Sequence, residues 1–137
     1  MAFSPSITYS GLIVDVRGTR YRPSLATRIL ENNRVVYDKS LANYQIYLSQ
    51  GPVSYAADAD EAITSPLVGP NPFAVKAAGV NPSERSEIYV DKDSADRIDQ
   101  IDRQQRILEY CRVIVLVGEE TMAWLRLQPW FTKEMEA

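Results

Sequence analysis

The sequence has no histidine and only one cysteine, Cys111, among its 137 residues. A single cysteine excludes an intramolecular disulfide, and without histidine the usual zinc ligand sets are excluded too. Glycine-rich phosphate loops and the nucleophile motif Gly-x-Ser-x-Gly are also missing. The sequence therefore predicts a protein that is not an enzyme and that holds no metal and no cofactor.

Long apolar runs are absent as well. No stretch approaches the roughly 18 residues needed to span a bilayer. Residues 1–6 have neither the basic nor the apolar part of a signal peptide. The residues leave two alternatives open: a cytoplasmic protein, or a chain whose export signal lies outside it. The net charge of −3 gives no general attraction to nucleic acid, so we expect no nucleic-acid partner.

What the chain does contain is the alternation typical of a β-strand. Leu12, Val14 and Val16 fall on one face of an extended segment that Gly11 and Gly18 bracket. A period of two residues predicts a strand with one buried face. A basic loop follows it.

Other local patterns predict the remaining elements. They are a hairpin at 26–37 that turns at Asn32-Asn33, a helix at 52–63, a second hairpin from strands at 73–78 and 86–90, a helix at 91–110 capped by Asp93 or Ser94, and a buried strand at 112–117. A short helix capped by Ser24 is the alternative for the start of the first hairpin. The pattern as a whole predicts an α+β domain, with a mixed or antiparallel sheet of about five strands and two main helices on one face.

We expect the α+β domain to occupy residues 1–118 and a separate C-terminal tail to occupy 119–137. Both tryptophans of the chain lie in this tail. The candidate contact residues there are Trp124, Leu127, Trp130 and Phe131. Large apolar side chains near a terminus either dock onto the domain's own core or contact a neighbouring copy. The residues leave both alternatives open.

Arginine is concentrated after the first strand. Arg17, Arg20, Arg22 and Arg28 lie within twelve residues, with no acid between Arg17 and Glu31. Three interpretations remain open: a charged sheet edge that discourages strand pairing, an ion-pairing face between subunits, or a site for anionic groups.

The acidic clusters favour structural roles. Asp58, Asp60 and Glu61 fit a solvated helix face. Residues 91–102 depart from a calcium loop. Asp96 stands where such a loop requires glycine, and Asp102 stands where it has glutamate. They fit a capped helix start better.

Six segments resemble, in order and spacing, a family of small bacterial outer-membrane lipoproteins that includes flagellar basal-disc and flagellar assembly lipoproteins. These segments are 8–18, 22–30, 35–37, 50–56, 68–77 and 111–115. The similarity covers roughly residues 8–117 and leaves the tail outside.

The resemblance implies a non-enzymatic structural subunit of a cell-envelope assembly. Such a subunit would lie in the periplasm or at the outer-membrane periphery and form a ring or homopolymer, with association with the flagellum as one option. Other envelope or flagellar proteins would be its further partners. Membrane attachment would require a lipid anchor that this chain does not contain. The alternative function is a module that binds an anionic polymer or glycan through the four arginines.

Overall fold

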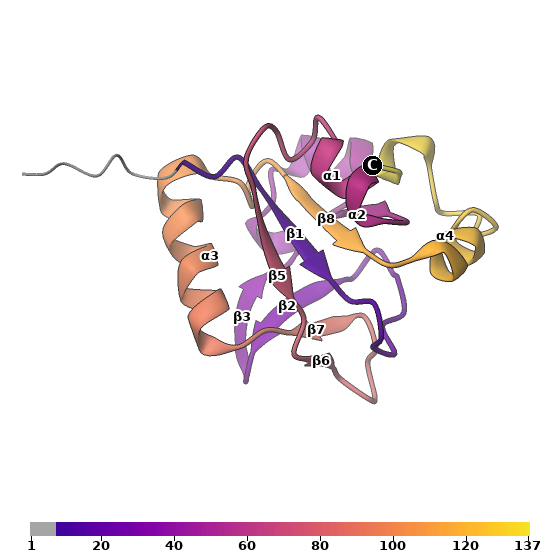
Figure 1. Cartoon of the computed structure of the whole chain (residues 1–137), viewed down its shortest axis with the longest axis horizontal. Coiled ribbons are helices and arrows are strands. Elements are labelled where there is room, and N and C mark those ends of the chain that lie inside the picture. Colours follow the sequence, from indigo (N-terminus) through magenta and orange to yellow (C-terminus); the bar gives the residue numbers. More distant parts are fainter. Residues whose placement is uncertain (1–7) are drawn as a thin grey trace, which may run out of the picture.

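The strands of this computed structural model, which describes residues 8–137, form two four-stranded sheets (Figure 1). The first sheet has the order β4 (Ser54–Ala56), β8 (Val113–Leu116), β1 (Gly11–Asp15) and β5 (Pro72–Lys76), and all its neighbours are parallel. The second has the order β3 (Arg34–Tyr37), β2 (Arg28–Glu31), β7 (Glu87–Tyr89) and β6 (Gly79–Val80), and only β2 and β7 are parallel. The α+β class is confirmed, while the strands divide into two sheets of four where one sheet of about five was expected.

Four α-helices and two short 3-10 turns accompany the sheets in the described residues. They are α1 (Tyr44–Gln50), α2 (Ala59–Thr64), α3 (Lys92–Gln105) and α4 (Glu119–Leu125), with η1 (Lys39–Leu41) and η2 (Lys133–Met135). The helix expected at 91–110 is α3, which is five residues shorter at its end. Its cap is Asp91 and not Asp93 or Ser94, because the Asp91 carboxylate accepts a hydrogen bond from the Ser94 N–H at 2.7 Å. The helix ends at Arg106, which adopts a left-handed conformation with φ 55°.

Two sequence predictions about elements are wrong. The helix expected at 52–63 is interrupted by β4, which pairs with β8 and is buried along its whole length, so tertiary pairing overrides the helix propensity of the alanines. The second hairpin does not form from 73–78 and 86–90. Instead β5 pairs with β1, and β7 makes its hairpin with β6.

The first hairpin and the buried strand are confirmed. β2 and β3 pair antiparallel around Asn32, which has φ 55°. Asparagine tolerates this conformation better than most residues. The alternative helix at Ser24 does not form: residues 25–26 make a single turn, in which the Ser24 hydroxyl accepts a hydrogen bond from the Ala26 N–H, and β2 begins at Arg28.

The core lies on both faces of the parallel sheet. Leu12 and Val14 of β1 join a large cluster that also contains residues of the second sheet and α3. Ile13 points to the opposite face and joins a smaller cluster with Ala62 of α2. The expected common face of Leu12, Val14 and Val16 is confirmed, but β1 is buried on both faces. Among residues 8–137, no helix has the length and apolar composition needed to cross a membrane.

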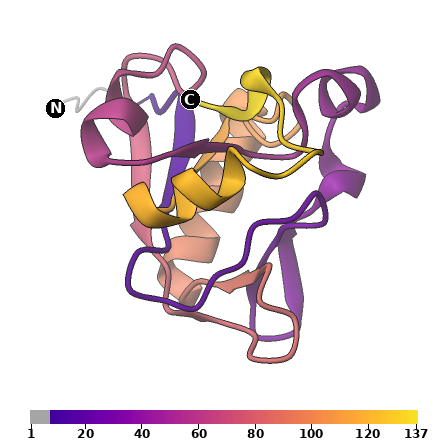
Figure 2. The ribbon, with the colours of Figure 1, turned by 90° about the vertical axis from the view of Figure 1, so that its right-hand side faces the viewer.

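The C-terminal segment returns to the free edge of β4. Tyr55 forms a parallel bridge with Glu136, and the Ala137 N–H donates to the Tyr55 carbonyl at 2.8 Å. Figure 2 shows this segment in yellow, running from α4 across the top of the molecule. The loop that follows β1 passes below α4 in the same view.

Candidate functional site

The candidate site lies where the loop after β1 meets α4. Both β1 and β8 end at the same edge of the parallel sheet, and carboxyl ends of parallel strands gather the loops that bind ligands in many α/β proteins. The loop at 16–27 follows β1, and Gly118 connects β8 to α4. Of the predicted arginines, Arg17, Arg20 and Arg22 belong to this loop.

Arg17 is held by Asp15, the last residue of β1. Its guanidinium donates to both carboxylate oxygens of Asp15 at 3.0 Å, and the Lys76 ammonium lies 3.7 Å from the same carboxylate. Partial burial alone would raise the pKa of Asp15, but the hydrogen bonds from Arg17 and the charge of Lys76 outweigh it and lower this pKa. The Arg17 side chain is therefore held in an ion pair at the C-terminal end of β1.

Arg28 is used within the second sheet. It lies opposite Glu87 in the β2–β7 register, and its guanidinium donates to the Glu87 carboxylate at 2.7 Å. Asp38 lies 3.8 Å from the same side chain. The structure thus separates Arg28 from the loop at 16–27 and assigns it to an ion pair between strands.

Arg20 and Arg22 have no acidic partner among the described residues, and the fold adds Arg85 to them. The Arg22 N–H donates to the Arg85 carbonyl at 3.0 Å, and the Arg85 guanidinium donates to the Arg20 carbonyl. These bonds hold the loop at 16–27 beside the segment that contains Arg85. Sequence reasoning missed Arg85 because it lies more than sixty positions away, in a segment read only as a turn.

A buried tyrosine anchors the loop to the core. The Tyr21 hydroxyl lies 2.7 Å from the Thr27 hydroxyl and 3.4 Å from the Tyr55 hydroxyl. Thr27 in turn donates to the Ser24 carbonyl at 2.9 Å. Burial raises the pKa of Tyr21 well above its usual value, and burial likewise raises that of Tyr55. Both hydroxyls therefore stay protonated at any ordinary pH and act as structural hydrogen-bonding groups.

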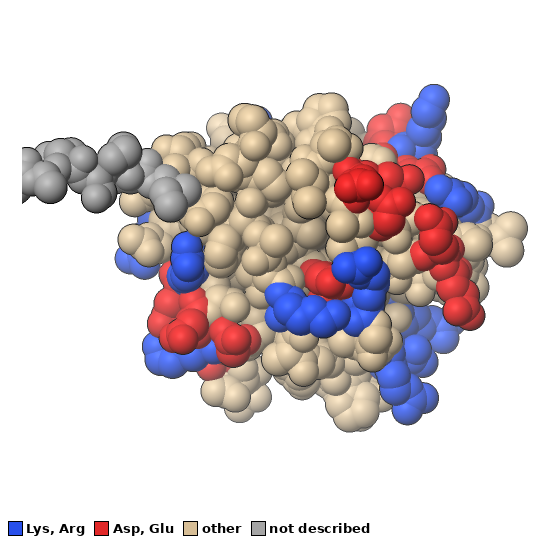
Figure 3. Space-filling model, viewed as in Figure 1, with Lys and Arg blue, Asp and Glu red and all other residues tan. Residues whose placement is uncertain are grey.

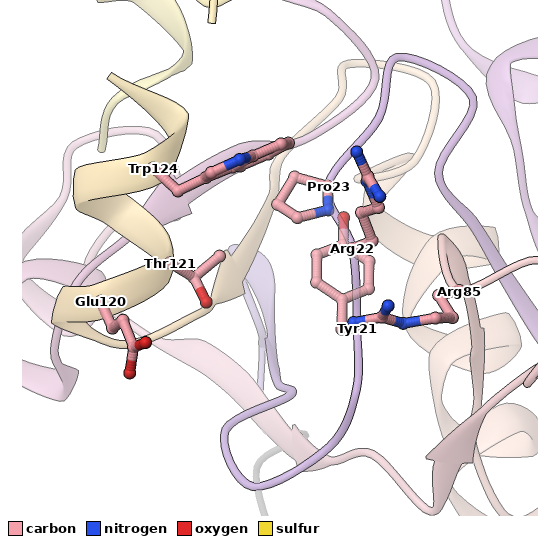
Figure 4. Close-up of a pocket in the computed structure, with 7 residues that line it drawn as sticks. All are labelled: Tyr21, Arg22, Pro23, Arg85, Glu120, Thr121 and Trp124. Carbon is pink, nitrogen blue, oxygen red and sulfur yellow. The ribbon is translucent and has the colours of Figure 1, made fainter. Parts of the chain in front are cut away.

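An open cavity of about 310 Å³ lies between this anchored loop and α4 (Figure 4). Its lining residues are Tyr21, Arg22, Pro23, Arg85, Glu120, Thr121 and Trp124. Trp124 and Thr121 project from α4 toward the loop, and Arg85 reaches in from the opposite side. The Arg22 guanidinium carbon lies 5.5 Å from the centre of the Trp124 ring, a cation–π arrangement. Glu120 points away from the two arginines.

Two further hollows continue the cavity at its ends. One, of about 350 Å³, shares Arg85 with it and adds Arg20 and Pro82. The other, of about 280 Å³, shares Arg22 and Trp124 and adds Trp130. We call this continuous depression the loop–α4 groove and define it by Arg20, Arg22, Arg85, Trp124 and Trp130. Arg20 and Arg85 line one half of the groove and Trp130 lines the other, with Arg22 and Trp124 in contact between them.

Charge is divided across this side of the molecule. Figure 3 shows lysine and arginine gathered below α4, and aspartate and glutamate gathered over α2 and α4 above them. The net charge of −3 hides this division, because acids outnumber bases over the chain as a whole. The groove is therefore locally basic on an acidic protein.

The tail docks onto the protein's own core. Trp124, Trp130 and Phe131 pack against the large cluster, and Phe131 lies 6.1 Å from Tyr55 between ring centres. Leu127, in contrast, is 81% exposed. Of the two alternatives for the tail, docking is the one observed within this chain. Contact of the tail with a neighbouring copy remains a prediction.

The acidic clusters take structural roles. Asp58 caps α2 by accepting from the Glu61 N–H at 2.8 Å, and Glu61 reaches back to the Ala57 N–H at 2.9 Å. These bonds form a reciprocal cap, which stabilises a helix start. Cys111 is fully buried before β8, as expected for a small apolar residue, and burial raises the pKa of its thiol.

A comparison with protein families finds one match. The profile of the family described as "Treponema pallidum Tp0624, second domain" matches residues 11–119, from the start of β1 to the first residue of α4. The chain belongs to this family. No curated protein matches the chain at a significant level. The matched range includes the loop at 16–27 and Arg85, whereas Trp124 and Trp130 lie beyond it.

Proposed function

We propose that this protein is a non-enzymatic structural subunit of a bacterial cell-envelope assembly, in which copies of the chain associate through α1. The proposal joins the sequence resemblance to envelope lipoproteins with one structural observation. It places the protein in the periplasm or at the outer-membrane periphery, with other envelope or flagellar proteins as further partners.

The exposed apolar face of α1 carries the proposal. None of the residues of α1 is buried. Tyr44 and Leu48 lie four positions apart, so they share one side of the helix. They are 67% and 60% exposed, and the preceding Leu41 is 47% exposed. Contiguous exposed apolar side chains mark interaction surfaces more often than isolated ones do.

A second copy of the same chain is the occupant that the charges favour. The segment Tyr44–Gln50 contains no acidic or basic residue. In a two-fold contact the same surface of each copy meets its counterpart, so a charge at the centre would face a charge of the same sign. An uncharged helix face avoids this repulsion. Burial of Tyr44 and Leu48 from both copies would then provide the driving force for association.

The non-enzymatic part of the proposal rests on how the titratable groups are used. Asp15 pairs with Arg17, Asp58 and Asp91 cap helices, and the Tyr21 hydroxyl is held by Thr27. Each of these groups has a structural partner that accounts for its position. Membership in a family named after a Treponema pallidum protein also fits a bacterial origin.

The test is the molar mass of the purified protein as a function of concentration. Light scattering after size exclusion should give a mass above the 15.5 kDa of one chain, rising with concentration. Leu48→Glu should return the mass to one chain, because it places charges opposite each other at the contact. Ile63→Glu is the matched control, since Ile63 is also an exposed aliphatic residue, at 55%, but lies on α2.

Two further outcomes decide the details. If Leu127→Glu and not Leu48→Glu dissociates the assembly, the tail forms the contact and the assignment to α1 is wrong. A single-chain mass for the wild-type protein at every concentration would contradict self-assembly. Recovery of the native protein in the cytosolic fraction of its host would contradict the envelope location.

A further inference from the structure

We infer that the loop–α4 groove is a binding site for an acidic glycan, a sugar chain that carries carboxylate or phosphate groups. This inference is independent of the proposed assembly, because α1 takes no part in the groove. The four arginines of the sequence do not act together in it. Two of them, Arg20 and Arg22, combine with Arg85, while Arg17 and Arg28 are held in ion pairs.

The first argument is the state of the three arginines. Within residues 8–137, neither Arg20, Arg22 nor Arg85 pairs with an acidic side chain, whereas Arg17, Arg28, Arg34, Arg106 and Arg126 all do. Arg97, Arg103 and Arg112 also lack an acidic partner there, but they line none of the three hollows of the groove. Guanidinium forks suit carboxylate and phosphate groups, which they bind through two parallel hydrogen bonds. Three such forks along one groove favour a ligand with repeated negative groups.

The second argument is the aromatic half of the groove. Trp124 and Trp130 line neighbouring hollows, and both are only partly buried, so ring surface remains accessible. The face of an aromatic ring carries negative charge density. The C–H groups on one side of a sugar ring are weakly positive and apolar, so they stack on such faces. Thr121 and Gln128 supply polar groups for sugar hydroxyls beside the two rings.

One feature of the groove argues against a peptide that adds as a strand. Such a peptide needs a free backbone edge, but the Arg22 N–H is already bonded to the Arg85 carbonyl. Glu120 also lines the central cavity, where its carboxylate can accept hydrogen bonds from sugar hydroxyls.

The groove offers a direct readout, because the two tryptophans that line it are the only ones in the chain. Titration with hexagalacturonate, an oligosaccharide of uronic acids, should produce a saturable change in tryptophan fluorescence. Neutral maltohexaose should produce none. Raising the salt concentration should weaken the binding, because it screens the arginines.

The variants are Arg20→Ala and Arg22→Ala, with Arg112→Ala as the matched control. Arg112 is exposed but precedes β8, at the opposite edge of the parallel sheet. Loss of a charge-assisted hydrogen bond should weaken binding about tenfold in each groove variant. Arg20 lines neither of the hollows that Trp124 lines, so its effect reports on the ligand and not on the fluorophore. The control should retain wild-type affinity.

Three results would overturn the inference. The first is an unchanged tryptophan signal up to millimolar hexagalacturonate, confirmed by calorimetry. The second is an equal loss of affinity in Arg112→Ala, which would show unspecific charge attraction. The third is tighter binding of oligoglutamate or of single-stranded oligothymidylate, which would make a peptide or a nucleic acid the occupant.

Discussion

Replacing Leu125 by alanine should destabilise the protein far more than the same change at Leu127, although both lie in the tail. Leu125 of α4 is 0% exposed and Leu127 is 81% exposed. A buried leucine-to-alanine change costs about 2–5 kcal/mol, because apolar area is lost and a cavity remains. A change at an exposed site usually stays within about 0.5 kcal/mol.

The size of this effect can be judged against the whole molecule. Domains of this kind have unfolding free energies of about 5–15 kcal/mol, so Leu125→Ala removes a large share. With a urea dependence of about 2 kcal/mol per molar, the unfolding midpoint should fall by about 1–2.5 M. The midpoint of Leu127→Ala should stay within about 0.3 M of the wild-type value.

Urea unfolding followed by circular dichroism at low protein concentration measures both variants. At low concentration a contact between copies contributes little, so the result reports on docking within one chain. Equal midpoints for Leu125→Ala and the wild type would refute the reasoning, because they would show that α4 is not part of the cooperative core. A loss as large in Leu127→Ala would refute it too.

Two other predictions concern the parallel sheet. The pKa of Asp15 is lowered from its ordinary value of 3.8, so its ion pair stabilises the fold above that pH and the stabilisation is lost as the pH falls through the lower folded value. Asp15→Asn should therefore flatten the fall of the unfolding free energy as the pH drops below about 4, and parallel curves for variant and wild type would contradict this. Gly11→Ala should cost about 1–3 kcal/mol, because a Cβ at Gly11 would lie 2.5 Å from the Cα of Val68. Gly79→Ala is its control, with no atom within 4 Å, and equal losses in urea unfolding would show that the close approach does not matter.

Elements specified by neighbouring residues could be predicted from the sequence. The β2–β3 hairpin follows from Asn32 between two apolar runs, and β8 from an unbroken apolar segment. β4 could not be predicted, because its three residues are extended only through pairing with β8. β5 was expected as a strand at 73–78, but its partner was not predicted, because it pairs with β1 about sixty positions earlier. A local pattern can indicate a parallel strand, but it does not reveal which distant strand will be its partner.

The candidate site was predictable only in part. The sequence showed that arginines are concentrated at 17–28, but the fold decides which of them are free. The β2–β7 register places Arg28 opposite Glu87, and the loop geometry returns Arg17 to Asp15. Arg85 joins the site through backbone bonds with a distant loop. No spacing rule reveals such a contact.

The return of the chain to β4 has a consequence for association between copies. The outer edge of a sheet exposes unpaired backbone groups, which can recruit a strand from another molecule and start aggregation. Here Glu136 and Ala137 occupy the edge at Tyr55. Strand addition on this side is therefore prevented by the protein's own backbone. A shortened variant that ends before residue 136 should become prone to edge-to-edge aggregation through β4. Such aggregation would be distinct from the ordered assembly proposed for the side chains of α1.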